Sequence, residues 1–235
     1  MSWLQSMSMP NMAWQRKFRC HSIMMLQGAA REDADTGGKI FLPPDALEDL
    51  ASRNVQYPMM FKLRNDSIGK ETHAGVLEFT ATPGHVYMPG WMMRNLLLQE
   101  DEIITVQNLS MVTCTYAKFQ PQSPDFLDIS NPKAVLENTL RKFSCLTVND
   151  IIAINYNNKV YEIEVLEVKP ENSDQAVSIV ECDMQLEFAA PIGYKEPERV
   201  RPAASDAATH AATAQVSTAA CSRRSSTFML MLDVS

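Results

Sequence analysis

The feature that most constrains the fold of this chain is an internal repeat with a strand, proline and helix pattern. Residues 40–50 (IFLPPDALEDL) align with residues 86–96 (VYMPGWMMRNL), and Pro43 aligns with Pro89. In each copy a short apolar strand precedes the proline, and apolar residues at helical spacing follow it. Two further strand patterns follow each copy, at residues 60–65 and 72–80 after the first and at residues 103–108 and 109–116 after the second. Two such units predict one small closed barrel of the double-psi type, because closure pairs the edges that short strands would leave open.

The second half of the chain has a different pattern. Residues 150–156 and 159–168 are apolar strands, and Asn157 and Asn158 between them form a two-residue turn that tolerates positive φ. Shorter strand patterns follow at residues 176–181 and 184–188. This arrangement predicts a smaller α+β subdomain built on a β-hairpin.

A proline-rich stretch, residues 118–131, separates the two patterns. Proline fixes its own φ and disfavours helical geometry in the preceding residue, so we expect a stiff, extended connector. A helix then begins at Pro132, with Asn131 as its N-cap. We therefore expect two rigidly coupled subdomains whose seam lies near residues 117–126.

These patterns predict a β-rich α+β protein in five parts. The parts are a flexible N-terminus at residues 1–17, a double-psi β-barrel subdomain at 18–117, a proline-rich hinge at 118–131, an α+β subdomain at 132–199 and a disordered tail at 200–235. The tail is rich in Ala, Ser and Thr and has no sustained apolar period, which is typical of disorder.

Composition narrows the environment and the partners. The net charge is −7, which argues against nucleic acid or an anionic membrane surface as a partner, since both require a basic face. The five cysteines include no Cys-x-x-Cys pair, so we expect buried thiols in a reducing compartment rather than a disulfide framework or a zinc site. No stretch approaches the roughly 20 apolar residues of a membrane helix, so we expect no membrane insertion. These features predict a protein of the cytoplasm and nucleus.

One short motif raises the question of catalysis. Asp35, Thr36 and Gly37 form the Asp-Thr-Gly triplet of aspartic proteases, in which two carboxylates share a proton. The triplet follows polar residues 31–34 instead of an apolar strand, and the chain has no second copy, so only a dimer could complete the pair. We interpret it as a surface loop and keep the dimeric protease as an alternative. The sequence has no phosphate-binding loop and no nucleophile elbow, and we expect no catalytic, cofactor-binding or metal-binding residues and no cofactor.

Seven blocks of sequence resemble the ubiquitin fusion degradation protein 1 family. They lie in the same order as in that family and cover about residues 18–199. The blocks are residues 37–47 (GGKIFLPPDAL), 57–63 (YPMMFKL), 73–79 (HAGVLEF), 88–98 (MPGWMMRNLLL), 116–138 (YAKFQPQSPDFLDISNPKAVLEN), 150–157 (DIIAINYN) and 191–199 (PIGYKEPER).

The resemblance implies a double-psi barrel followed by an α+β subdomain, and a non-catalytic adaptor that binds ubiquitin and polyubiquitin chains. It also implies two further partners, a nuclear protein localisation protein 4 homologue and the valosin-containing-protein AAA ATPase. With them the family delivers ubiquitylated clients to degradation, including clients from the cytosolic face of the endoplasmic reticulum. The family's Phe-x-Gly-x-Gly-type docking motifs have no match in residues 200–235, which contain no glycine. A scaffold without ubiquitin affinity remains a further alternative.

Binding modules commonly use the crevice between subdomains or an exposed strand edge. We therefore place the candidate binding residues at the expected seam between the subdomains. They are Phe119, Gln120, Ser123, Asp125 and Phe126.

Overall fold

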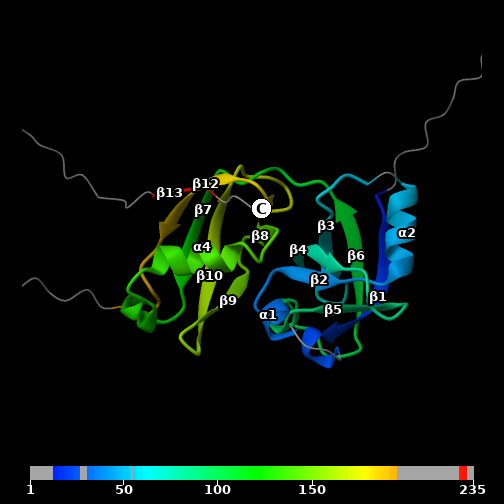
Figure 1. Cartoon of the computed structure of the whole chain (residues 1–235), viewed down its shortest axis with the longest axis horizontal. Helices are drawn as coiled ribbons and strands as arrows, with labels where there is room; N and C mark the ends of the chain where they lie inside the picture. Colours follow the sequence, from blue (N-terminus) through cyan, green and yellow to red (C-terminus); the bar gives the residue numbers. More distant parts are fainter. Residues whose placement is uncertain (1–12, 27–30, 54, 195–227, 232–235) are drawn as a thin grey trace, which may run out of the picture.

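Two lobes lie side by side in the structure, a computed structural model that describes residues 13–26, 31–53, 55–194 and 228–231. The first lobe is a closed β-barrel, and the second is a five-stranded sheet with helix α4 (Pro132–Leu140) across one face (Figure 1). None of the helices in the described ranges is both long and apolar enough to span a membrane.

Six strands close into the barrel in the order β1-β5-β2-β4-β3-β6. They are β1 (Gln15–Ser22), β2 (Lys39–Phe41), β3 (Met60–Asn65), β4 (Lys70–Glu78), β5 (His85–Met88) and β6 (Ile103–Leu109). Alternate residues of these strands point inward and fill the interior. Those with no exposed surface include Ile40, Phe61, Leu63, Val86, Met88, Ile104 and Val106.

The pairing pattern repeats with two-fold symmetry. Strand β2 runs parallel to β4, and β5 likewise runs parallel to β1. Strand β3 is antiparallel to β4, and β6 is likewise antiparallel to β1. Helices α2 (Pro44–Ser52) and α3 (Gly90–Asn95) occupy equivalent places after β2 and β5, and Pro43 and Pro89 are their N-caps. The predicted repeat is therefore present as β2-α2-β3-β4 and β5-α3-β6-β1.

The last strand of the second repeat comes from the beginning of the described chain. We expected residues 109–116 to form it, and this prediction is wrong, because residues 110–115 leave the barrel and lead to the second lobe. Strand β1 takes the place instead and begins at Gln15, so residues 15–17 are not a flexible N-terminus. Residues 1–12 lie outside the described residues.

The second lobe is a sheet of order β13-β12-β7-β10-β9. Its strands are β7 (Tyr116–Pro121), β9 (Ile151–Tyr156), β10 (Lys159–Lys169), β12 (Asp183–Phe188) and β13 (Phe228–Met231), and a small pair joins β8 (Cys145–Thr147) to β11 (Ala176–Ser178). The predicted turn is confirmed, since Asn157 and Asn158 have φ values of 49° and 58°. The predicted helix cap is also confirmed, because Asn131 accepts a hydrogen bond from Ala134 N.

The proline-rich stretch is not a connector, so the predicted hinge at residues 118–131 and the seam at 117–126 are wrong. Residues 118–121 of this stretch belong to β7, which lies in the middle of the second sheet and pairs with both β10 and β12. Ala117 and Phe119 alternate inward, and Pro121 ends the strand where its missing N–H costs least. Its next part is the short 3-10 helix η2 (Pro124–Asp128), at the end of the lobe away from the barrel (Figure 1).

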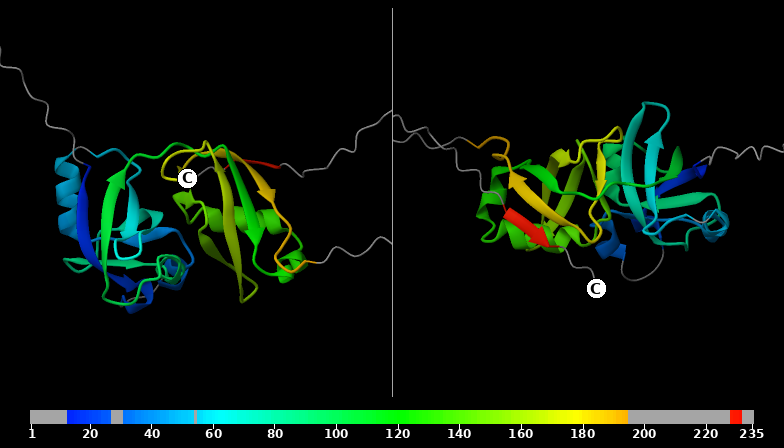
Figure 2. Two further views of the ribbon diagram at one scale, coloured as in Figure 1. Left: turned by 180° about the vertical axis from the view of Figure 1, so that it is seen from behind. Right: turned by 90° about the horizontal axis from the view of Figure 1, so that it is seen from above.

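Part of the C-terminal tail forms strand β13. Residues 228–231 pair antiparallel with β12, so the expectation of disorder throughout residues 200–235 is wrong for these four residues. In Figure 2 this red strand lies along the rim of the second lobe, beside the yellow β12. The other tail residues lie outside the described residues.

Candidate functional site

The lobes meet where β4 and α3 of the barrel contact β8 and β9 of the second lobe. Two glycines allow the backbones to approach closely. A Cβ added at Gly38 would lie 2.3 Å from the Phe143 ring, and one added at Gly75 would lie 2.2 Å from Ser144 Oγ. Such distances are far below van der Waals contact, so the junction requires glycine at both positions.

Aromatic packing continues the junction beside these glycines. The rings of Trp91 on α3 and Phe143 lie 5.7 Å apart. The Trp91 indole also donates a hydrogen bond to Gly37 O at 2.8 Å, which satisfies its buried N–H. The barrel and the second lobe consequently share one apolar core cluster.

A buried carboxyl group, Asp150, lies in the same junction and is 5% exposed. Thr72 Oγ1 on β4 donates to it, and Asn95 Nδ2 on α3 donates to its Oδ1 at 3.3 Å. Burial raises the pKa of Asp150 to about 7, because an ionised carboxylate is poorly solvated there. Asp150 therefore joins two barrel elements to the second lobe through polar contacts.

His73 is the buried polar neighbour of Thr72 on β4 and is 2% exposed. Its Nδ1 lies 3.1 Å from Thr147 Oγ1, while its Nε2 has no hydrogen-bond partner among the described residues. Burial, helped by the positive charge of Lys62, lowers the pKa of His73 to about 4. His73 is therefore neutral near pH 7.

The outer edge of the junction forms a small crevice of about 210 Å³. It is lined by Thr36, Val135, Asn138, Thr139, Lys142, Asn155 and Tyr156. Lys142 forms an ion pair with Asp33 of the barrel lobe at 3.0 Å, and Arg94 and Glu162 lie 3.6 Å apart across the junction. The crevice is smaller than the usual 300–1,000 Å³ of small-molecule sites.

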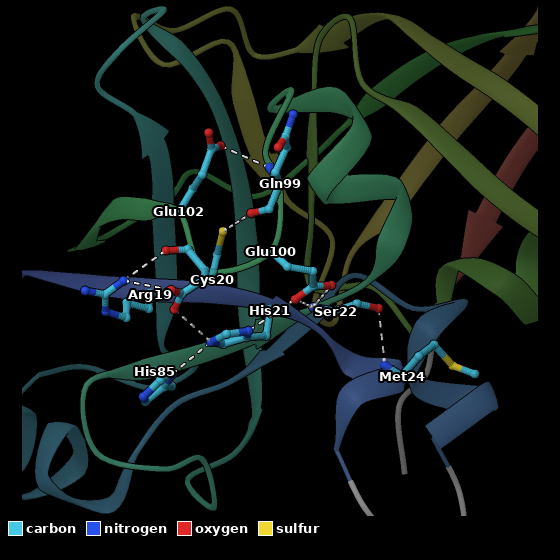
Figure 3. Close-up of polar contacts among 10 residues, drawn as sticks. Arg19, Cys20, His21, Ser22, Met24, His85, Gln99, Glu100 and Glu102 are labelled. Carbon is cyan, nitrogen blue, oxygen red and sulfur yellow. Dashed lines mark hydrogen bonds and ion pairs between the residues drawn. The ribbon is translucent and has the colours of Figure 1, made fainter.

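A second polar cluster joins β1, β5 and the loop before β6 (Figure 3). His21 Nε2 lies 2.8 Å from His85 Nδ1, and His21 Nδ1 lies 3.1 Å from Glu100 Oε2. Glu100 also accepts two hydrogen bonds from Ser22 N, at 3.0 and 3.2 Å. These contacts tie the end of β1 to the loop, and we find no group of side chains in the described ranges that could hold a metal ion.

The four cysteines of the described chain are free and buried, as expected, while Cys221 lies outside the described residues. Burial raises the pKa of the Cys20 and Cys182 thiols to about 11 and that of Cys114 to about 12, and it also raises the pKa of Cys145. A thiol is a nucleophile only as thiolate, so these side chains have a packing role.

Asp35, the residue of the protease alternative, caps a helix. It ends α1 (Arg31–Asp35), and its Oδ1 accepts a hydrogen bond from Gly90 N at 2.7 Å. Gly90 is the first residue of α3, where backbone N–H groups lack partners within the helix. The carboxylate at this position thus has a structural explanation.

The five candidate binding residues lie within the second lobe and not between the lobes. Phe119 and Phe126 are buried and pack against Phe188, with ring centroids 6.4 and 5.7 Å away. Gln120 donates to Ala190 O at 3.0 Å, Ser123 Oγ caps η2, and Asp125 forms an ion pair with Lys159. The expected seam at these residues is wrong, because this stretch forms strand β7 and helix η2 and not a linker. Whether any of the five residues contacts a partner stays a prediction.

Sequence reasoning did not identify the residues that meet at the junction. Thr72 and Asp150 are 78 positions apart, and His73 and Thr147 are 74 apart. Local pattern carries no information on such pairs. The available signal was a polar residue next to an apolar run, as with Asp150 before residues 151–154.

Two family models match consecutive parts of the chain. Residues 14–112 match the model described as "Ubiquitin fusion degradation protein UFD1, N-terminal subdomain 1", and residues 113–191 match "N-terminal subdomain 2" of the same protein. The chain belongs to the ubiquitin fusion degradation protein 1 family. The boundary between the family's two subdomains falls in the segment that leaves the barrel, between β6 and β7.

Curated relatives of this family cover the same region. The chain is 58% identical over 184 residues to "Ubiquitin recognition factor in ER-associated degradation protein 1" of Homo sapiens and of Mus musculus, over 78% of this chain and 59% of each relative. It is 50% identical over 182 residues to "Ubiquitin fusion degradation protein 1" of Saccharomyces cerevisiae, over 77% of this chain and 50% of the relative. The chain therefore spans between half and three fifths of the length of these ubiquitin fusion degradation family members.

Proposed function

We propose that this protein is a non-catalytic ubiquitin-binding adaptor of protein degradation. It recognises polyubiquitylated substrates and recruits them to an AAA ATPase unfoldase for proteasomal and ER-associated degradation. The observation that carries the proposal is the match of both lobes, residues 14–191, to the two subdomains of the ubiquitin fusion degradation family. The relatives named for ubiquitin recognition in ER-associated degradation, at 58% identity, support the same role.

The geometry is compatible with binding and offers little for catalysis. In the described residues the thiols have raised pKa values, His73 is buried, and Asp35 caps a helix. The two-fold pairing of the six barrel strands supports our proposal that the barrel is of the double-psi type. No observation of the structure favours the dimeric protease.

Membership of the family supports a proposal on the partners and the place of action. We propose that the adaptor works with a nuclear protein localisation protein 4 homologue and the valosin-containing-protein ATPase, in the cytoplasm, in the nucleus and at the cytosolic face of the endoplasmic reticulum. Because the chain spans only part of its relatives, these contacts have their own test: capture of the purified ATPase and of the partner adaptor by the full chain.

The ubiquitin test is an NMR titration of the isotope-labelled full chain with monomeric ubiquitin and with tetraubiquitin. We expect shifts on one contiguous surface and a single-site affinity on the order of micromolar or weaker, as for small interfaces. Chains should saturate at lower concentration if the protein has more than one site, through effective concentration. The acidic chain should bind more weakly at higher salt.

The matched control is ubiquitin whose apolar surface patch has been replaced by polar residues. It should cause no shifts, because apolar contact is expected to supply most of the binding free energy. If neither ubiquitin at about millimolar concentration nor tetraubiquitin shifts any resonance, the adaptor proposal fails and a scaffold without ubiquitin affinity takes its place.

A further inference from the structure

The outer edge of β12 is paired with a strand from a remote part of the chain. In the register of this pair, Asp183 lies opposite Met231, Met184 opposite Leu230, and Leu186 opposite Phe228. The described chain breaks off at Tyr194 and resumes at Phe228, so β13 does not follow β12 directly. Figure 2 shows β13 (red) as the last strand of the sheet, at its open rim.

Strand β12 itself is held firmly by the sheet. It pairs in parallel with β7 along its inner edge, and Met184 and Leu186 are buried. Gln185 N donates to Thr115 O at 3.0 Å, and Ala189 N donates to Phe119 O at 2.8 Å. The backbone N–H and C=O groups of the odd-numbered residues of β12 therefore point toward β7.

Backbone groups alternate in direction along a strand, so the even-numbered residues Met184 and Leu186 point theirs outward to β13. Without a strand there, this edge would present unpaired N–H and C=O groups next to a fixed, buried strand. By the same alternation Leu230 and Phe228 are the residues of β13 that exchange hydrogen bonds with β12. Met229 and Met231 point their backbone groups away.

The segment that occupies this edge shows what the edge accepts. Residues 228–231 read Phe-Met-Leu-Met, an uncharged apolar run without proline or glycine. Main-chain pairing supplies affinity that depends little on sequence, and the side chains add a preference. An edge that takes such a segment suits an extended apolar stretch, of the kind that an unfolded protein exposes.

We propose that the outer edge of β12 is a binding site for an extended, uncharged, apolar segment of another protein, and that residues 228–231 occupy it in cis as a competitor. Because residues 228–231 belong to the same chain, they compete for this edge at an effective concentration that an incoming segment must exceed. The site would hold an unfolded client independently of ubiquitin.

The test uses a pair of proline substitutions in the full chain. Leu230→Pro removes an N–H that points at β12 and should release the internal strand. Met229→Pro is the matched control, because its N–H points away and an edge strand tolerates proline there. The probe is a fluorescent peptide of residues 226–233, and its binding is followed by fluorescence polarisation.

We expect the peptide to bind the Leu230→Pro chain at least about tenfold more tightly than the unchanged chain or the Met229→Pro chain, because only the first has lost its competitor. A peptide carrying proline at the position of Leu230 should not bind, while one with proline at the position of Met229 should.

Three results would overturn the proposal. They are no binding of the peptide to the Leu230→Pro chain, equal binding to all three chains, and equal binding of the two proline peptides, which would indicate non-specific apolar adhesion. A dimer of the unchanged chain that Leu230→Pro dissolves would show that the strand pairs between two copies, against occupation in cis. None of these results bears on ubiquitin binding, since ubiquitin is absent from the assay.

Discussion

Gly38 and Gly75 lie where the barrel backbone contacts the second lobe. A single methyl group added at either position, as in alanine, would overlap atoms of the second lobe. At Gly75 the obstruction is both Ser144 Oγ and Ser144 Cβ, at 2.2 and 2.6 Å from the position a Cβ would take. A hydroxyl can rotate away, but a Cβ is fixed to the backbone. The junction would therefore have to open before it could accept an alanine.

We predict that Gly75→Ala lowers the free energy of unfolding by about 1–3 kcal/mol, the usual cost of overpacking a fitted core. Urea denaturation measures it. The matched control is Gly90→Ala, because a Cβ at Gly90 has its nearest neighbour at an ordinary 3.6 Å. Adding Ser144→Gly to Gly75→Ala removes the obstruction and should recover part of the loss; no recovery would contradict the steric explanation.

The junction contains two buried titratable groups, Asp150 and His73, which have opposite effects on how stability changes with pH. The pKa of Asp150 is raised to about 7, so the folded chain keeps a proton that the unfolded chain releases above about pH 4. Its contribution to stability is therefore lost as the pH rises from about 4 to 7. The pKa of His73 is lowered to about 4, so the unfolded chain binds a proton below about pH 6.5 that the folded chain does not. Its contribution grows as the pH rises from about 4 to 6.5.

We predict that these two effects offset one another in the parent protein and separate in single variants. Asp150→Asn should become more stable as the pH rises from about 4 to 6.5, and His73→Asn should become less stable as the pH rises from about 4 to 7. The measurement is the free energy of unfolding in urea at half-unit steps of pH. Three parallel curves would show that neither group titrates differently on folding.

Sequence pattern succeeded for those elements whose signals are local. The repeat around Pro43 and Pro89, the cap at Asn131 and the turn at Asn157 were read correctly, because each depends on neighbours a few residues away. The assignment failed for residues 118–131, where strand alternation at Ala117 and Phe119 outweighs the prolines. It also missed residues 15–17 of β1 and the whole of β13, whose partners lie far away in the sequence. The five candidate binding residues lie in the stretch 118–131, so their expected position between the lobes is wrong, while their role in binding stays a prediction.

At the scale of the whole molecule the lobes share one core. The same apolar cluster contains Leu63 and Trp91 of the barrel lobe and Phe143 and Ile152 of the second lobe. Neither lobe can separate without exposing this shared surface to water, which is unfavourable in proportion to its apolar area. The rigid coupling expected from the sequence thus has a physical basis at the junction.

We predict that the two lobes unfold in one cooperative transition. Tryptophan fluorescence, with Trp14 and Trp91 in the barrel lobe, and far-UV circular dichroism, which reports both lobes, should give coincident urea curves. The Gly75→Ala variant serves as a comparison, since a loosened junction should begin to separate the curves. Distinct midpoints in the parent protein would show that the lobes are independent folding units.

The position of β1 in the barrel has a consequence for synthesis on the ribosome. Its neighbours are β5, where Arg19 lies opposite His85, and β6, where Gln15 lies opposite Gln107. Strand β1, the first strand of the described residues, therefore has both of its partners only after residues 103–109 have been synthesised, and Trp14 and Phe18 lack their core until then. Long-range closure of this kind is slow and exposes apolar surface. During that period the nascent chain exposes to solvent the apolar side chains that the closed barrel buries.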